Sequence, residues 1–127
     1  MTYKVLIVDD SKLARMAAAK VLADSHPDWA AVEAGSAGLA MSATQEASPD
    51  IALVDFNMPG RDGLDLAADL IKLKPRMPIA VISANHQQQI IDRAQALGAA
   101  FLPKPLSKKA LEDFLQAALQ KLKTPVP

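Results

Sequence analysis

Five short apolar runs recur along the chain, and their starts are separated by 27, 21, 28 and 21 residues. They are Tyr3–Val8, Ala30–Ala34, Ile51–Val54, Ile79–Ile82 and Ala100–Leu102. Three of these runs carry Val or Ile in succession without polar alternation, which is typical of strands that are covered on both faces. The second and fifth runs are rich in Ala and are weaker strand candidates by themselves. The pattern predicts five strands.

Helical patterns fill the intervals that follow these runs. The predicted helices are Ser11–Asp24, Ser36–Ala47, Leu64–Leu73, Gln88–Leu97 and Ser107–Leu122. The last pattern is the clearest, because its apolar positions recur at steps of three and four residues. Asp62 stands where an N-cap would serve the third helix, and Gly98 suits the left-handed end of the fourth. Because parallel neighbours need a crossover, the alternation predicts an α/β fold with a parallel sheet covered by helices on both faces.

The length of 127 residues corresponds to about one domain, and the pattern contains no internal repeat. Half of the residues are apolar and 22% are charged, which argues against a disordered chain. We predict one domain over residues 1–123. Residues 124–127 are expected to be a tail or the start of a linker, because their two prolines cannot extend the last helix.

Charge and composition narrow the classes of partner. Fourteen Lys and Arg residues balance fourteen Asp and Glu residues, so no basic field is present to hold nucleic acid. The absence of Cys excludes disulfides, thiolate catalysis and zinc–cysteine sites. No export signal stands at the start, and no apolar run approaches the roughly 18 residues of a membrane span. We therefore expect a cytoplasmic protein with neither a nucleic acid nor a membrane as its direct partner.

Polar side chains gather where the predicted strands end. Asp9-Asp10 follow the first run, Asp55 the third, Ser83 the fourth and Lys104 the fifth. Each has an ordinary structural explanation when taken alone, such as a helix cap or a solvated charge. In an open parallel sheet, however, the carboxyl ends of the strands meet at one edge, and ligands bind there. Three carboxylates in one place repel one another unless a cation joins them, and oxygen ligands favour Mg²⁺ or Mn²⁺.

Four segments carry a family resemblance: Asp9–Arg15 (DDSKLAR), Val54–Gly63 (VDFNMPGRDG), Ile82–Ala84 (ISA) and Phe101–Pro105 (FLPKP). Their order and spacing over Lys4–Leu122 resemble the receiver domain of two-component response regulators, the CheY-like family. Ser83 stands where Thr is more usual, which keeps the hydroxyl group. The resemblance implies a (βα)5 fold of the flavodoxin-like type, with a doubly wound five-stranded sheet in the order 2-1-3-4-5.

The resemblance also implies roles for individual residues around a metal. Asp55 would accept a phosphoryl group from a phosphohistidine on a sensor histidine kinase or a phosphotransfer protein. Asp10 and Asp55 would bind Mg²⁺ directly, with Mn²⁺ as a substitute, and Asp9 would do so directly or through water. The backbone carbonyl of Asn57 would complete the ligands from the protein.

Further residues would transmit the modification. Lys104 would pair with the Asp55 carboxylate and then with the acyl phosphate, and Lys104–Pro105 is a plausible cis peptide. Ser83 would hydrogen-bond to the phosphoryl group, and the ring of Phe101 would turn inward as the loop moves. The contact surface for a downstream effector, or for an output domain lost from the C-terminal end, would lie over Gln88–Leu122.

The leading hypothesis is a phosphoacceptor that phosphorylates itself and slowly loses its phosphate, without turning over a metabolite. Three other functions compete with this hypothesis. A receiver-shaped binding module would work without phosphorylation. A Mg²⁺-dependent aspartyl-phosphate hydrolase of the haloacid dehalogenase type would need a second Asp where Asn57 stands. A flavodoxin-like electron carrier would need hydroxyls and glycines where Asp9-Asp10 would repel a flavin phosphate.

Overall fold

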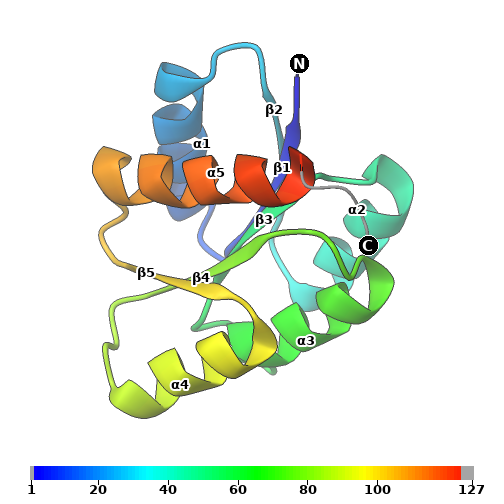
Figure 1. Ribbon diagram of the computed structural model, residues 1–127. Coiled ribbons are helices and arrows are strands. Elements are labelled where there is room, and N and C mark those ends of the chain that lie inside the picture. The colour runs from blue at the N-terminus through cyan, green and yellow to red at the C-terminus, as the bar shows by residue number, and fades with distance from the viewer. Residues whose placement is uncertain (1, 124–127) are drawn as a thin grey trace.

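A five-stranded sheet lies between two layers of helices in the computed structural model, which describes residues 2–123 (Figure 1). The strands are β1 (Lys4–Val8), β2 (Ala30–Ala34), β3 (Ile51–Asp55), β4 (Ile79–Ser83) and β5 (Ala100–Pro103). The helices are α1 (Lys12–Ser25), α2 (Ala37–Ala47), α3 (Gly63–Leu73), α4 (Gln88–Leu97) and α5 (Lys108–Lys123). The predicted tail, residues 124–127, lies outside the described residues. No helix within residues 2–123 has the length and apolar character needed to cross a bilayer.

All strand pairs are parallel, and the sheet order is β2-β1-β3-β4-β5. This order confirms the predicted fold class. The chain starts in the middle of the sheet, adds β2 on one side and then builds β3, β4 and β5 on the other. The order therefore reverses at β1 and β3, and the loops after these two strands diverge to opposite faces. Such a switch point leaves a crevice at the carboxyl edge of the sheet.

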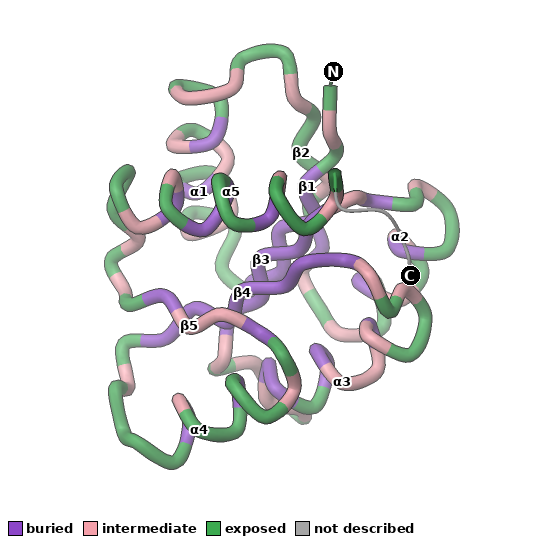
Figure 2. The backbone as a smooth tube through the Cα atoms, viewed as in Figure 1, coloured by how far each residue is buried: buried purple, intermediate pink, exposed green. Residues whose placement is uncertain are grey.

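Two apolar cores hold the layers together, one on each face of the sheet. Successive strand residues point to opposite faces, so Val5 and Ile7 join α1 and α5, whereas Leu6 and Val8 join α2, α3 and α4. The central strands β3 and β4 are buried along their whole length (Figure 2). Burial on both faces explains why these strands appear in the sequence as continuous apolar runs.

The predicted elements agree with the observed ones to within about a residue at each end, and the helix caps explain the small differences. Ser11 is the N-cap of α1 rather than a helical residue, and Asp62 is the N-cap of α3, as predicted; both side chains accept hydrogen bonds from the first turns of their helices. Gly98 ends α4 with a φ of 79°, as predicted for a left-handed cap. Strands β3, β4 and β5 each extend one residue further than predicted, onto the residues that carry polar chemistry or lead to it.

Candidate functional site

The carboxyl edge of the sheet collects side chains from four strands. β1 leads to Asp9 and Asp10, β3 ends in Asp55, β4 ends in Ser83, and Lys104 follows β5. Because β1, β3, β4 and β5 are consecutive neighbours in the sheet, these strand ends form one continuous row. The predicted convergence of these residues therefore follows from the sheet order.

Three carboxylates form the centre of the site. One oxygen from each of Asp9, Asp10 and Asp55 lies within 4.8 Å of the other two. Asp9 and Asp55 are buried, whereas Asp10 is exposed. The cluster is thus open on the side of Asp10, and a hydrated cation has a route to all three groups from that side.

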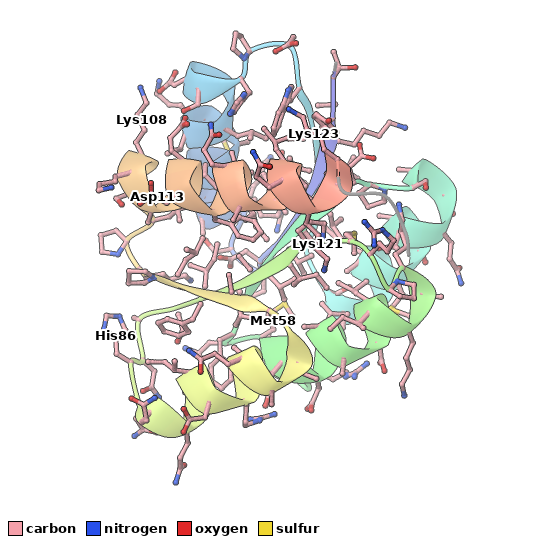
Figure 3. All side chains as sticks on the ribbon, viewed as in Figure 1. Met58, His86, Lys108, Asp113, Lys121 and Lys123 are labelled. Carbon is pink, nitrogen blue, oxygen red and sulfur yellow. The ribbon has the colours of Figure 1, made fainter. Side chains whose placement is uncertain are left out.

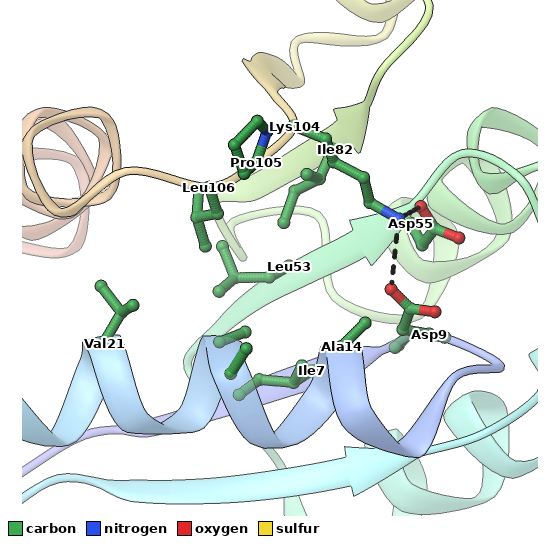
Figure 4. Close-up of a pocket in the computed structure, with 13 residues that line it drawn as sticks. Ile7, Asp9, Ala14, Val21, Leu53, Asp55, Ile82, Lys104, Pro105 and Leu106 are labelled. Atoms are coloured by element: carbon green, nitrogen blue, oxygen red, sulfur yellow. Dashed lines mark hydrogen bonds and ion pairs between the residues drawn. The ribbon is translucent and has the colours of Figure 1, made fainter.

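Lys104 supplies the positive charge of the cluster. Its Nζ atom lies 2.7 Å from Oδ1 of Asp55 and 3.4 Å from Oδ2 of Asp9 (Figure 4). Both approaches are ion pairs, and the contact with Asp9 also has the geometry of a hydrogen bond. The backbone N–H of Lys104 donates to the carbonyl of Ser83 at 3.0 Å, so the β4 strand end holds this residue in place. The Lys104–Pro105 peptide is cis, as expected from the sequence.

The charges in this cluster do not balance, and the pKa values respond. Burial raises the pKa of Asp55, the neighbouring charges of Asp9 and Asp10 add to the rise, and Lys104 opposes it. Burial by itself would lower the pKa of Lys104, but the contacts with Asp55 and Asp9 outweigh it and raise that pKa. The main causes of the two shifts differ, because burial leads the rise for Asp55, whereas the neighbouring carboxylates produce the rise for Lys104. A divalent cation bound to the oxygens would relieve the excess negative charge.

The loop after β3 is fixed close to the phosphoacceptor candidate. The Gly63 N–H donates to the carbonyl of Phe56 at 2.8 Å, which folds the loop back on the strand end. A Cβ atom at Gly63 would lie only 2.3 Å from the backbone oxygen of Asp55, so this approach requires glycine. Asn57 lies exposed in this loop, two residues after Asp55, and Met58 is half-buried beside it (Figure 3). The part of Asn57 in metal binding stays a prediction.

The predicted switch residues lie on β4 and β5. Ser83 is fully buried, and its hydroxyl accepts a hydrogen bond from the N–H of Asn85 at 2.9 Å. Phe101 is half-buried, and its ring meets that of His86 edge-on, with the ring centres 5.7 Å apart. His86 itself is exposed in the loop between β4 and α4 (Figure 3). The loop after Ser83 therefore contacts both the buried hydroxyl and the predicted switch aromatic.

Asp9 is held from several directions, and one of its partners carries no predicted role. Its Oδ1 accepts from the N–H of Ser11 at 2.9 Å, and its backbone carbonyl accepts from Nη1 of Arg15 at 2.6 Å. Arg15 is also paired with Glu33 on the neighbouring strand β2. Glu33 lies 18 residues away from Arg15 in the sequence, so no local pattern could have shown this link.

An apolar cavity of about 250 Å³ opens beside the charged cluster (Figure 4). Asp9, Asp55 and Lys104 line one end of it. Apolar residues of three strands, of α1 and of the segment after β5 line the remainder: Ile7, Val8, Leu53, Ile82, Ala14, Ala17, Ala18, Val21, Pro105 and Leu106. The charged groups thus border a low-dielectric surface, which strengthens the electrostatic interactions among them.

The model of the response regulator receiver domain family matches residues 5–116. The chain belongs to this family of two-component signalling proteins. Among curated relatives, it is 33% identical to the glycerol metabolism activator of Pseudomonas putida over 119 residues, covering 92% of this chain and 54% of that protein. It is also 33% identical to the transcriptional regulatory protein PdtaR of Mycobacterium tuberculosis over 121 residues, covering 94% and 58%. The chain spans little more than half the length of these two relatives.

Other relatives join a similar region to an enzyme. The chain is 40% identical over 106 residues to a protein-glutamate methylesterase/protein-glutamine glutaminase of Chromohalobacter salexigens, covering 80% of this chain and 29% of that protein. Among solved structures, the chemotaxis protein CheY4 of Vibrio cholerae is 26% identical, with a TM-score of 0.83 and coverage of 93% and 99%. The fold is shared by a CheY-like receiver domain protein of Methanospirillum hungatei, which is 22% identical. Its TM-score is 0.86, and the alignment covers 97% of this chain and 98% of that one.

Proposed function

We propose that Asp55 is the phosphoacceptor of this receiver domain and that its modification switches a protein-interaction surface. One observation carries the proposal: oxygens of Asp9, Asp10 and Asp55 lie within 4.8 Å of one another, and the Lys104 ammonium lies 2.7 Å from Asp55. A carboxylate attacks an anionic phosphoryl group only where positive charge offsets the repulsion between them. Family membership supports the same chemistry.

The donor set fits Mg²⁺, with Mn²⁺ as a substitute. All ligand candidates are oxygens, the cluster carries excess negative charge, and Asp10 leaves one side open to solvent. We infer that Asp9, Asp10, Asp55 and the backbone carbonyl of Asn57 hold the ion. A bound Mg²⁺ would neutralise charge on the phosphoryl oxygens, as in other phosphoryl transfers.

The residues of the chain then have distinct tasks. An oxygen of Asp55 forms a bond to phosphorus while the bond from phosphorus to the donor's histidine nitrogen breaks, which leaves an acyl phosphate and a neutral imidazole after proton uptake. Lys104 stays beside the transferred group as a fixed positive charge. Hydrolysis by water later returns inorganic phosphate and the Asp55 carboxylate. The task of the protein is mostly positioning and charge compensation.

The switch involves Ser83 and Phe101. The Ser83 hydroxyl oxygen accepts from the Asn85 N–H, and its O–H would donate to a phosphoryl oxygen on Asp55. Moving Ser83 towards the phosphoryl group pulls on the loop that carries His86, which contacts the ring of Phe101. Phe101 has no polar atom on its side chain, so it can change its burial without losing a hydrogen bond. The phosphoryl group thereby biases an existing two-state element.

Partners follow from this assignment. The phosphodonor is a sensor histidine kinase or a phosphotransfer protein, and the receiving partner is an effector or an output domain. We place the contact surface on α4, β5 and α5, next to the switch residues. We further propose that residues 1–123 form the receiver unit. The predicted cytoplasmic location stays a prediction.

The domain signals, and we propose that it turns over no free metabolite. The methylesterase relatives are about three times as long as the matched region, so a receiver region makes up less than a third of them. Asn57 stands two residues after Asp55, where an aspartyl-phosphate hydrolase needs a second acid, and an amide cannot transfer a proton in that role. Repeated turnover of a small phosphomonoester would contradict this assignment.

Labelling with a small phosphodonor tests the phosphoacceptor. Incubation with acetyl phosphate and Mg²⁺ should add one phosphoryl group to the intact protein, measured by mass spectrometry under mild conditions. Asp55→Asn should remove the added mass. Asp50→Asn is the matched control at the opposite end of β3, where the native carboxylate accepts a hydrogen bond from the Lys4 N–H at 2.9 Å, and it should label normally. Equal labelling of Asp55→Asn, or no labelling of the wild-type protein, would contradict the proposal and favour a binding module that works without phosphorylation.

A further inference from the structure

The Arg15 side chain spans the gap between the acidic cluster and the edge strand β2. It leaves the first turn of α1, and only 16% of it is exposed. Nη1 donates to the backbone carbonyl of Asp9 at 2.6 Å, and Nε donates to Oε1 of Glu33 at 3.1 Å. The guanidinium also lies against Gly35, where a Cβ atom would come within 3.1 Å of Nη1. The planar group is therefore held on three sides.

The oxygen that Arg15 holds belongs to the peptide between Asp9 and Asp10. Because a peptide unit is planar, fixing this oxygen also fixes the direction in which the chain leaves towards the Cα atom of Asp10. The Asp10 carboxylate makes no hydrogen bond or ion pair with any other residue in the described part of the chain. Its position therefore depends on the backbone that carries it, which Arg15 restrains on the side of Asp9 and the Asp9 carboxylate restrains at Ser11.

The remaining polar atoms of Asp9 are also occupied. Its N–H donates to the carbonyl of Ala34 at 3.2 Å, Oδ1 accepts from the Ser11 N–H, and Oδ2 accepts from Lys104. Arg15 binds the backbone carbonyl of Asp9, the one oxygen of this residue that these contacts do not use. Asp9 and the peptide that leads to Asp10 are thus held by contacts within the chain.

We propose that Arg15 is a positioning residue of the cation site, which anchors the Asp9–Asp10 peptide to β2 through Glu33. The inference rests on the proposed function, because it takes these acids to be the ligands of Mg²⁺. Partners that orient metal ligands typically contribute ten- to a hundredfold to metal affinity. Arg15 acts through the backbone and touches neither the phosphoryl group nor the ion.

The sign of the effect separates positioning from simple electrostatics. If Arg15 acted only as a nearby positive charge, removing it would reduce repulsion and tighten the binding of Mg²⁺. If Arg15 holds the ligands in place, removing it frees the Asp9–Asp10 peptide, and Mg²⁺ must then order that peptide as it binds. A positioning role therefore predicts that Mg²⁺ binds more weakly when Arg15 is removed, whereas charge alone predicts tighter binding.

Isothermal titration with MgCl₂ at low ionic strength tests the proposal. Arg15→Ala should raise the dissociation constant of Mg²⁺ about tenfold. Arg76→Ala is the matched control, since Arg76 also donates to a backbone carbonyl, that of Lys121 at 3.0 Å, but lies before the amino end of β4. This control should leave the affinity within about twofold of wild type, even if it lowers thermal stability, because no metal ligand depends on Arg76.

A second variant and a spectroscopic readout protect the test against misfolding. Glu33→Ala keeps Arg15 but removes its anchor, and it should raise the dissociation constant about threefold, a part of the effect of losing Arg15 itself. In Mg²⁺-free protein, the Asp10 amide resonance should move in Arg15→Ala. The inference would be overturned if folded Arg15→Ala bound Mg²⁺ as tightly as wild type or more tightly. If Arg15→Ala does not fold, the same result in Glu33→Ala would overturn it. Failure of the wild-type protein to bind Mg²⁺ would instead overturn the proposed function.

Discussion

The tight contact between Gly63 and the end of β3 makes a quantitative prediction. In Gly63→Ala, the new Cβ atom would lie 2.3 Å from the backbone oxygen of Asp55 and 2.9 Å from Cα of Phe56. Restoring the 3.0 Å that real Cβ atoms keep requires a shift of at least about 0.7 Å between α3 and β3. Neither side yields easily, because β3 is buried between two neighbouring strands and α3 buries Leu64 and Leu66. We expect Gly63→Ala to cost about 3 kcal/mol, at the upper end for overpacking.

Urea and thermal denaturation measure this cost, and a second glycine provides the control. For a chain of this size, about 3 kcal/mol corresponds to a fall of roughly 10 °C in the unfolding midpoint. Gly38→Ala introduces the same methyl group into α2, where no atom lies within 4 Å, and it should stabilise the protein by up to about 0.5 kcal/mol. The two variants should therefore change stability in opposite directions. Equal stability of Gly63→Ala and Gly38→Ala would refute the packing argument.

Three further predictions concern the charged cluster. The pKa of Asp55 lies above its ordinary value of 3.8, so ionisation of this carboxyl group costs the native state free energy. Metal-free Asp55→Asn should therefore be more stable than wild type at neutral pH. Denaturation curves at several pH values should show this gain in stability shrinking as the pH falls through the raised pKa towards 3.8. Mg²⁺ at about a hundred times its dissociation constant should raise the midpoint of thermal unfolding by roughly 5–10 °C. EDTA should reverse this increase, and the Asp10→Asn variant should not show it. An identical rise in Asp10→Asn would place the ion elsewhere. Lys104→Met should slow labelling by acetyl phosphate at least about tenfold. The same variant should bind Mg²⁺ more tightly in calorimetry, because the substitution removes an ammonium group from the cluster. Labelling at the normal rate would remove Lys104 from the proposed chemistry.

The elements of this fold were predictable because parallel strands buried on both faces leave an unambiguous pattern. Ile51–Val54 and Ile79–Ile82 are continuous apolar runs, and both prove to be strands without exposed residues. The Ala-rich run Ala30–Ala34 is a strand by virtue of its pairing with β1 rather than by its own propensity. Sequence spacing indicated only that this run is a strand, since the runs alternate with helices of similar length. The sheet order required the family resemblance, because alternation alone is compatible with more than one winding.

The chemistry of the site was predictable to the level of residue type. Strand ends that carry Asp9, Asp55 and Lys104 must meet at one edge of a parallel sheet, whatever the details of packing. The distances and the unequal burial of Asp9 and Asp10 were not predictable, because both depend on how the elements around the end of β1 pack against one another. Phe101 was expected to act as a switch, and its contact with His86 depends on how the loop after β4 closes over β5.

The sequence by itself determined which elements form and which acids stand at their ends, because local periodicity and strand termination are properties of short segments. Only the tertiary structure decided what restrains those acids. The link from Asp9 through Arg15 to Glu33 joins a residue just after β1 to residues on α1 and β2, and the clearance at Gly63 depends on how closely α3 approaches β3. Both depend on distances between elements, which are set by packing across the sheet and therefore have no signature within any one segment.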